Sequence, residues 1–86
     1  MVRFMMEVDN DPGLLPRLLQ PLAKRSLVPE RMWSYRMEDG MHVEIAVVAS
    51  DEEAHLIEGN LHQTVGVRSV ARVGEVRRAP ELRRVA

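Results

Sequence analysis

The stretch Asp9-Asn10-Asp11-Pro12-Gly13, followed by Leu14-Leu15, joins two segments of different periodicity and decides how the chain folds. Before it, residues 2 to 9 largely alternate between inward apolar and outward polar side chains, which is the period of a β-strand with one buried face. After it, leucines recur at helical spacing from Leu14 to Arg25. The sequence therefore predicts a strand, a tight polar turn and a helix N-terminus in direct succession.

This turn has the composition of a small anion-binding corner. Pro12 suits the first helical position, and Gly13 lets a ligand or a partner's backbone approach closely. Asn10 or Asp11 can cap exposed helix amides. The free amides of Leu14 and Leu15 and the helix dipole would favour a carboxylate. A helix cap without any ligand is the simpler interpretation, and this segment alone favours it.

The second half of the first helix and the hairpin that follows carry their own signals. Pro21 removes an interior amide bond, so we expect a bend or a shortened helix. Residues 27 to 38 predict an edge strand, because Pro29 cannot donate to a ladder. Asp39-Gly40 predicts a two-residue turn with positive φ at both positions. Apolar residues alternate from Met41 to Ala49, and the other face is also rather apolar through Ala46 and Val48, which indicates a central strand.

The last two elements complete a familiar order. Ser50 and Glu53 form a capping box that predicts a helix start at Asp51. Val67 to Val73 predicts a final strand whose inward register is ambiguous. The order β-α-β-β-α-β indicates a ferredoxin-like α+β fold, a four-stranded antiparallel sheet with two helices on one face. Residues 1–74 form this one domain, and residues 75–86 are expected to form a polar C-terminal tail.

Composition excludes several functional classes. The 86 residues include no cysteine, which removes disulfides, thiol catalysis and zinc–cysteine sites, and the three histidines, His42, His55 and His62, form no ligand motif. We expect no metal and no cofactor. The net charge of −1 argues against nucleic acid. No apolar run suggests a membrane span and no signal peptide is visible, so the cytoplasm is the expected location.

Residue types also separate the uses of this fold. RNA-recognition domains need aromatic residues on the central strands, but residues 41 to 49 contain none and Phe4 is expected to point inward. No nucleophile has a base at usable spacing, so we expect no catalytic activity.

A short chain gains burial by self-association. Adaptable methionine and aromatic side chains suit a contact patch, and the candidates are Met5, Trp33, Met37 and Met41. For Trp33, Met37 and Met41 a place in the core is the alternative.

The chain resembles the ACT domain family of amino-acid-binding regulatory modules from about Val2 to Val73. The similarity rests on the turn and helix residues Asn10-Asp11-Pro12-Gly13-Leu14-Leu15, Leu18 and Leu22-Ala23-Lys24-Arg25, and on the hairpin leading to Val43-Glu44-Ile45. Within the family it is most similar to the short small subunits of acetolactate synthase, through residues 43 to 50, the helix after them and the last strand.

The resemblance implies a homodimer with an amino-acid effector at its interface, and a large catalytic subunit of acetolactate synthase as partner in branched-chain amino-acid biosynthesis. Asn10 matches the asparagine that such subunits use for a branched-chain amino acid. Ser26 and Val28 stand where the family usually has glycine and a second asparagine, which favours activation without strong feedback inhibition. The implied effector-binding residues are Asn10, Asp11, Pro12, Gly13, Leu14, Leu15 and Val28.

Two alternatives to the regulatory subunit remain at this stage. One is a free-standing amino-acid sensor, and the other is a purely structural dimerisation module whose edge strands pair two larger chains. The carboxylate of Asp11 bears on the choice, because a carboxylate that already caps the helix competes with a bound ligand for the same donors.

Overall fold

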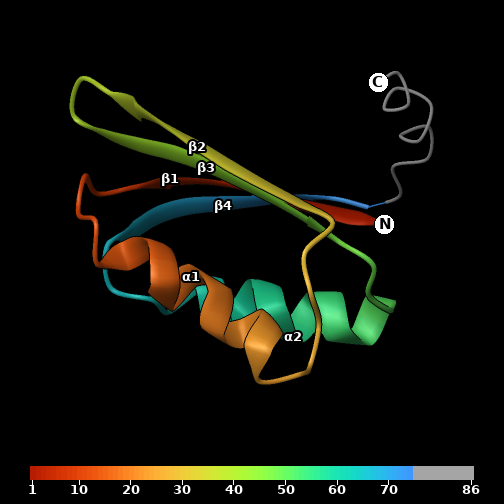
Figure 1. Ribbon diagram of the computed structural model, residues 1–86. Helices are drawn as coiled ribbons and strands as arrows, with labels where there is room; N and C mark the ends of the chain where they lie inside the picture. Colours follow the sequence, from red (N-terminus) through yellow and green to blue (C-terminus); the bar gives the residue numbers. More distant parts are fainter. Residues whose placement is uncertain (75–86) are drawn as a thin grey trace, which may run out of the picture.

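The computed structural model describes residues 1–74, and the tail expected at residues 75–86 lies outside this range. The elements follow the predicted order (Figure 1): β1 Val2–Val8, α1 Leu14–Ala23, β2 Arg31–Met37, β3 Gly40–Val47, α2 Asp51–His62 and β4 Val67–Val73. The strands form one sheet in the order β2-β3-β1-β4, with every neighbouring pair antiparallel. The ferredoxin-like fold is confirmed, with β2 at an edge and β3 in the interior.

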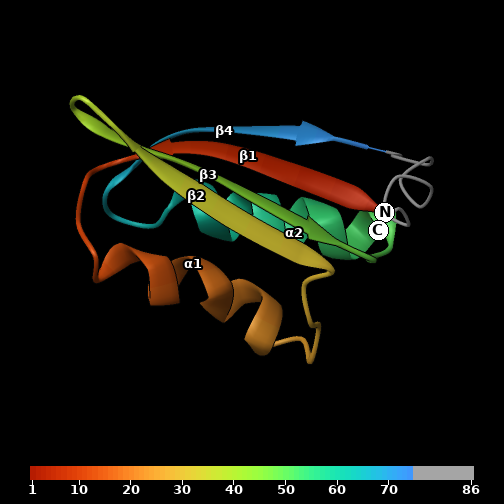
Figure 2. The same cartoon turned by 45° about the horizontal axis from the view of Figure 1, so that its top comes forward.

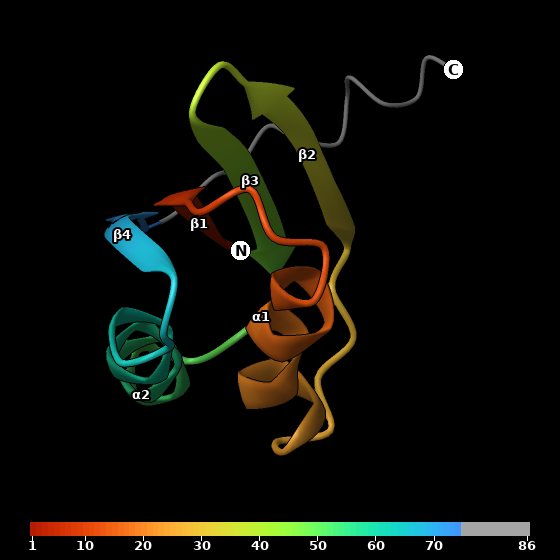
Figure 3. The same ribbon diagram turned by 90° about the vertical axis from the view of Figure 1, so that its left-hand side faces the viewer.

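Both helices cover the same face of the sheet. The end-on view shows α2 below the β4 side and α1 nearer to β3 and β2 (Figure 3), and the tilted view shows the opposite face without any helix above it (Figure 2). None of the helices within residues 1–74 has the length and apolar character needed to cross a membrane. The molecule therefore has a covered face, which holds the core, and an open face.

The core lies between the helices and the inward positions of the strands. On β1 the inward residues Val2, Phe4, Met6 and Val8 are all buried, as the alternation predicts. Val70 of β4 pairs with Met6 and packs against the core, which settles the inward register of that strand. The other buried residues of the core are Leu14, Leu18, Leu22, Met41, Val43, Ile45, Val47, Ala54, Ile57 and Leu61. Ala46 is also buried but lies on the open face, opposite Arg3 and Arg31.

The N-termini of the two helices are capped differently. At α2 the capping box is complete, since the Ser50 hydroxyl accepts a bond from the Glu53 amide at 3.0 Å and the Glu53 carboxylate accepts one from the Ser50 amide at 3.0 Å. At α1 the N-cap is Gly13 and carries no side-chain cap. The placement of Pro12 at the first helical position is therefore wrong, because the helix begins two residues later.

The C-terminal end of α1 is closed by a Schellman motif. The Ser26 amide donates to the Ala23 carbonyl and the Leu27 amide donates to the Leu22 carbonyl, each at 3.0 Å. Ser26 takes the left-handed conformation that this motif requires, with φ of +58°. α1 ends at Ala23, earlier than the predicted Arg25, and the interior proline Pro21 lies in its last turn.

The hairpin between β2 and β3 is offset by one residue from the predicted turn. Met37 pairs with Gly40, so the two turn residues are Glu38 and Asp39, and Gly40 is the first residue of β3. Among residues 1–74 only Ser26 and Gly66 have positive φ, so the prediction of positive φ at Asp39 and Gly40 is wrong. Gly40 is needed for a close approach instead, because a Cβ there would lie 2.6 Å from the Val8 carbonyl oxygen.

Candidate functional site

The corner between β1 and α1 is held by backbone bonds and by one aspartate. The Asp9 amide donates to the Gly66 carbonyl at 2.8 Å, which ties the corner to the start of β4. The Asp11 carbonyl accepts from the Leu14 amide and its carboxylate accepts from the Gly13 amide, both at 2.9 Å. Asp11 therefore occupies the Leu14 amide, which an effector carboxylate was expected to use, and also the neighbouring Gly13 amide.

Arg17 closes the corner further. Its guanidinium donates to the Asp11 carboxylate at 3.3 Å and to the Gly13 carbonyl at 3.2 Å. Both charged side chains are about half exposed, so this contact is easily exchanged with water and contributes at most about 1 kcal/mol. The expectation that the Leu14 amide is free is wrong, because the Asp11 backbone carbonyl accepts from it. The Asp11 carboxylate binds the Gly13 amide and does not cap the helix.

The other predicted effector residues differ in how accessible they are. Asn10, Pro12 and Gly13 are exposed at the corner. Leu14 is fully buried, and Leu15 is half-buried and packs against the core. The two leucine side chains therefore belong to the packing under the sheet, and only the backbone of this segment faces the corner.

Val28 is separated from the corner by the whole of α1. It lies in the loop that leads into β2, and 81% of its surface is exposed. A helix of ten residues spans about 15 Å, and the two loops lie at opposite ends of it in Figure 1. Within one chain the structure does not bring Val28 to Asn10.

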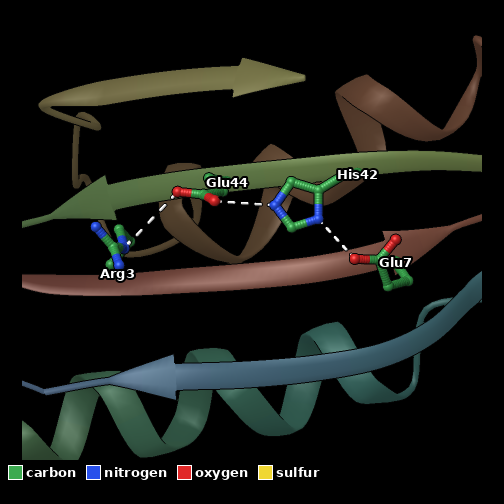
Figure 4. A network of polar contacts seen from close by, with 4 residues as sticks. All are labelled: Arg3, Glu7, His42 and Glu44. Carbon is green, nitrogen blue, oxygen red and sulfur yellow. Dashed lines mark hydrogen bonds and ion pairs between the residues drawn. The ribbon is translucent and has the colours of Figure 1, made fainter. Parts of the chain in front are cut away.

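A chain of polar contacts that sequence reasoning missed crosses the open face (Figure 4). The His42 ring contacts the Glu7 carboxylate through Nδ1 at 2.6 Å and the Glu44 carboxylate through Nε2 at 2.9 Å. Glu44 also lies 3.7 Å from Arg3. The alternation places all four side chains on outward positions, but only the register, with Glu7 opposite His42, shows that they meet. No cluster suited to a metal ion occurs within residues 1–74.

The two carboxylates determine the charge of the histidine. Hydrogen bonds from the ring to Glu44 and then to Glu7 raise the pKa of His42 above 6.5, against a smaller opposing effect of burial. In the protonated ring both nitrogens donate, so each carboxylate receives a bond, whereas a neutral ring would leave one nitrogen lone pair facing a carboxylate. The arrangement therefore favours the imidazolium.

Two aromatic side chains of β2 lie on the same face as this chain of contacts. The Trp33 and Tyr35 rings stack with centroids 5.4 Å apart, and Tyr35 stacks on His42 at 5.3 Å. Trp33 and Met37 are each 43% exposed, in agreement with a contact patch. Met41 is only 8% exposed and belongs to the core, so its assignment to the patch is wrong. Tyr35, which is 49% exposed, takes its place.

Comparison with known proteins agrees with this architecture. A family model described as an ACT-like domain matches residues 1–78. The chain belongs to the ACT-like domain family. A search of curated proteins found no match.

Solved structures share the fold at low sequence identity. The ACT domain from GTP pyrophosphokinase of Chlorobium tepidum superposes with a TM-score of 0.71 at 10% identity, covering 87% of this chain and 86% of that one. An uncharacterised protein from Thermotoga maritima gives 0.63 at 20% identity, covering 84% and 91%. The regulatory subunit of aspartate kinase from Thermus thermophilus gives 0.63 at 15% identity, covering 84% of this ACT-like chain but 48% of the subunit.

Proposed function

We propose that this ACT-like chain is a non-catalytic regulatory subunit that dimerises through β2 and acts on a larger catalytic chain. The observation that carries the proposal is the β2 edge. Within residues 1–74, β2 pairs with β3 alone, which leaves one row of its backbone donors and acceptors unpaired. Such an edge is a template for a second strand. The exposed side chains of Trp33, Tyr35 and Met37 add apolar area beside it.

A twofold axis normal to the sheet would join two such edges into one continuous sheet. The two β2 strands would then run antiparallel, and so would the two α1 helices, which lie toward this side of the sheet. Each Asn10 corner would face the loop after α1 of the other copy. This arrangement supports the effector set, because Val28 of the partner subunit would reach the corner that Val28 of the same chain cannot.

An effector at this shared corner has to displace the internal contacts of Asp11. A branched-chain amino acid would place its carboxylate near the Gly13 amide, where the helix dipole favours negative charge, and its ammonium near Asn10 or Asp11. Because Asp11 already accepts from the Gly13 amide, we expect weak effector binding by the subunit alone. Association with the catalytic chain is the main role, and effector binding is secondary to it.

The partner proposed here is the catalytic subunit of acetolactate synthase, on the basis of the sequence similarity through residues 43 to 50 and the flanking elements. Adding this chain is expected to raise the activity or the thermal stability of that enzyme. Met37→Lys places a charge beside the β2 edge and should weaken both dimerisation, measured by sedimentation, and activation. Leu56→Lys is the matched control, because Leu56 has a similar exposure of 47% but lies on α2.

Three outcomes separate the proposal from its alternatives. A monomer at all concentrations that leaves enzyme activity unchanged would refute it. A dimer that responds to valine, leucine or isoleucine with a higher melting temperature, lost in Asn10→Ala, but that has no effect on the enzyme would indicate a free-standing sensor. A dimer with neither response would indicate a structural dimerisation module.

A further inference from the structure

The open face of the sheet contains a cavity that is remote from the corner. It has a volume of about 180 Å³ and is lined by Met1, Arg3, Arg31, Trp33, Glu44 and Ala46. The register places Arg31, Ala46 and Arg3 side by side in one row across β2, β3 and β1. This row lies at the start of β1, whereas the corner follows the end of β1.

Two guanidinium groups at this cavity have unused donors. The Nε atom of Arg3 is buried and has no hydrogen-bond partner among residues 1–74, and its 3.7 Å separation from Glu44 is too long for a hydrogen bond. Within residues 1–74, Arg31 makes no ion pair and no side-chain hydrogen bond. A buried donor without a partner is costly, so an acceptor that enters the cavity would be bound.

The charge of Glu44, the one carboxylate of the lining within residues 1–74, is already balanced by two neighbouring cations. Oε1 of Glu44 faces Arg3, and Oε2 contacts Nε2 of His42 at 2.9 Å. In the part of the chain that the structure describes, no other acidic side chain lines the cavity. An incoming ammonium group would therefore meet two arginine cations beside a carboxylate whose charge Arg3 and His42 already balance, whereas an incoming carboxylate would find free donors.

The rest of the lining is apolar and limits the size of the ligand. Trp33 provides an aromatic wall, and Met1 and Ala46 provide aliphatic surface. The volume corresponds to about six water molecules at roughly 30 Å³ each, which suits a body of a few carbon atoms. Guanidinium groups bind carboxylates with paired hydrogen bonds.

We propose that this cavity binds a small carboxylate that carries an apolar body and no amino group. The carboxylate lies on Arg31 and Arg3, and the apolar body lies against Trp33. The site is distinct from the corner, which the proposed function assigns to an amino acid, and it does not depend on that assignment or on dimerisation through β2.

Trp33 gives a direct readout, because it is the only tryptophan of the chain. Its fluorescence is followed at neutral pH and low salt during separate titrations with isovalerate, valine and inorganic phosphate. Isovalerate and valine share their carbon skeleton and differ by the α-amino group. We expect a saturable change with isovalerate and binding at least about tenfold weaker for valine, since its ammonium would lie beside two guanidinium cations. Phosphate, which lacks the apolar body, should also bind at least about tenfold more weakly.

Two exposed arginines of β2 provide the matched variants. Arg31→Gln removes a cation from the cavity and should weaken isovalerate binding by about tenfold or more. Arg36→Gln makes the same change on the opposite face of the strand and should leave binding unchanged. Circular dichroism shows whether each variant is folded. The proposal is overturned by an absence of saturable response to isovalerate, by valine or phosphate binding as tightly as isovalerate, or by unchanged binding in folded Arg31→Gln.

Discussion

Gly40→Ala tests whether the first residue of β3 has to be glycine because of its neighbours. A Cβ at this position would lie 2.6 Å from the Val8 carbonyl oxygen, about 0.8 Å closer than the 3.4 Å at which ordinary contact begins. It would also lie 2.9 Å from the Arg68 guanidinium, which donates to the Asp39 carbonyl at 2.7 Å and to the Asp9 carboxylate at 2.9 Å. The first neighbour is backbone, so relief requires β1 and β3 to separate where they pair.

The expected cost of this overpacking is about 1–3 kcal/mol in the free energy of unfolding, with additional loss where Arg68 is displaced. In a domain of this size each kcal/mol lowers the melting temperature by about 4–8 °C. Chemical denaturation followed by circular dichroism measures the change. Gly59→Ala is the control, because a Cβ there meets nothing within 4 Å on an exposed helix position, so it should stabilise by about 0.5–1 kcal/mol. Equal stability of the two variants would refute the argument from close approach.

Two further substitutions test the left-handed conformation of Ser26 and the positive charge of His42. Ser26→Gly should stabilise the protein by about 0.5–1 kcal/mol, because glycine adopts the φ of +58° without the side-chain penalty. Thermal denaturation measures this change, with Ser26→Ala, which keeps the penalty, as the control. A lower stability of Ser26→Gly than of the wild type would contradict the argument. Since the two carboxylates raise the folded pKa of His42 above 6.5, the stability gained is complete below about pH 6.5 and is lost as pH rises through the raised pKa. Wild type should therefore exceed His42→Gln in unfolding free energy by more at pH 6 than at pH 9, and a constant difference would exclude the imidazolium.

Local patterns were sufficient to predict the fold. The period-two alternation of β1, the leucine spacing of α1 and the capping box at Ser50 each depend on neighbours close in sequence, and each is confirmed. The errors in the elements are small shifts. The helix start is two residues later than predicted, where Asp11 binds the Gly13 and Leu14 amides, and the turn is one residue earlier, because Met37 pairs with Gly40.

The chemistry of the surfaces could not be predicted in the same way. His42 has no motif within its own segment, because one of its two carboxylate partners, Glu7, lies 35 positions away and meets it only through strand register. The closure of the corner by Arg17 depends on side-chain orientation, which composition does not specify. The sequence left Met41 between the contact patch and the core, and only its exposure of 8% decides for the core.

The length of α1 has a consequence for any molecule that touches both of its ends. Because one chain holds Asn10 and Val28 apart, a ligand that contacts both side chains binds only when two chains are assembled. Occupancy and assembly are then thermodynamically linked: dilution lowers the apparent affinity, and saturating ligand lowers the dissociation constant of the pair. Dose–response curves at several protein concentrations would therefore fail to superimpose.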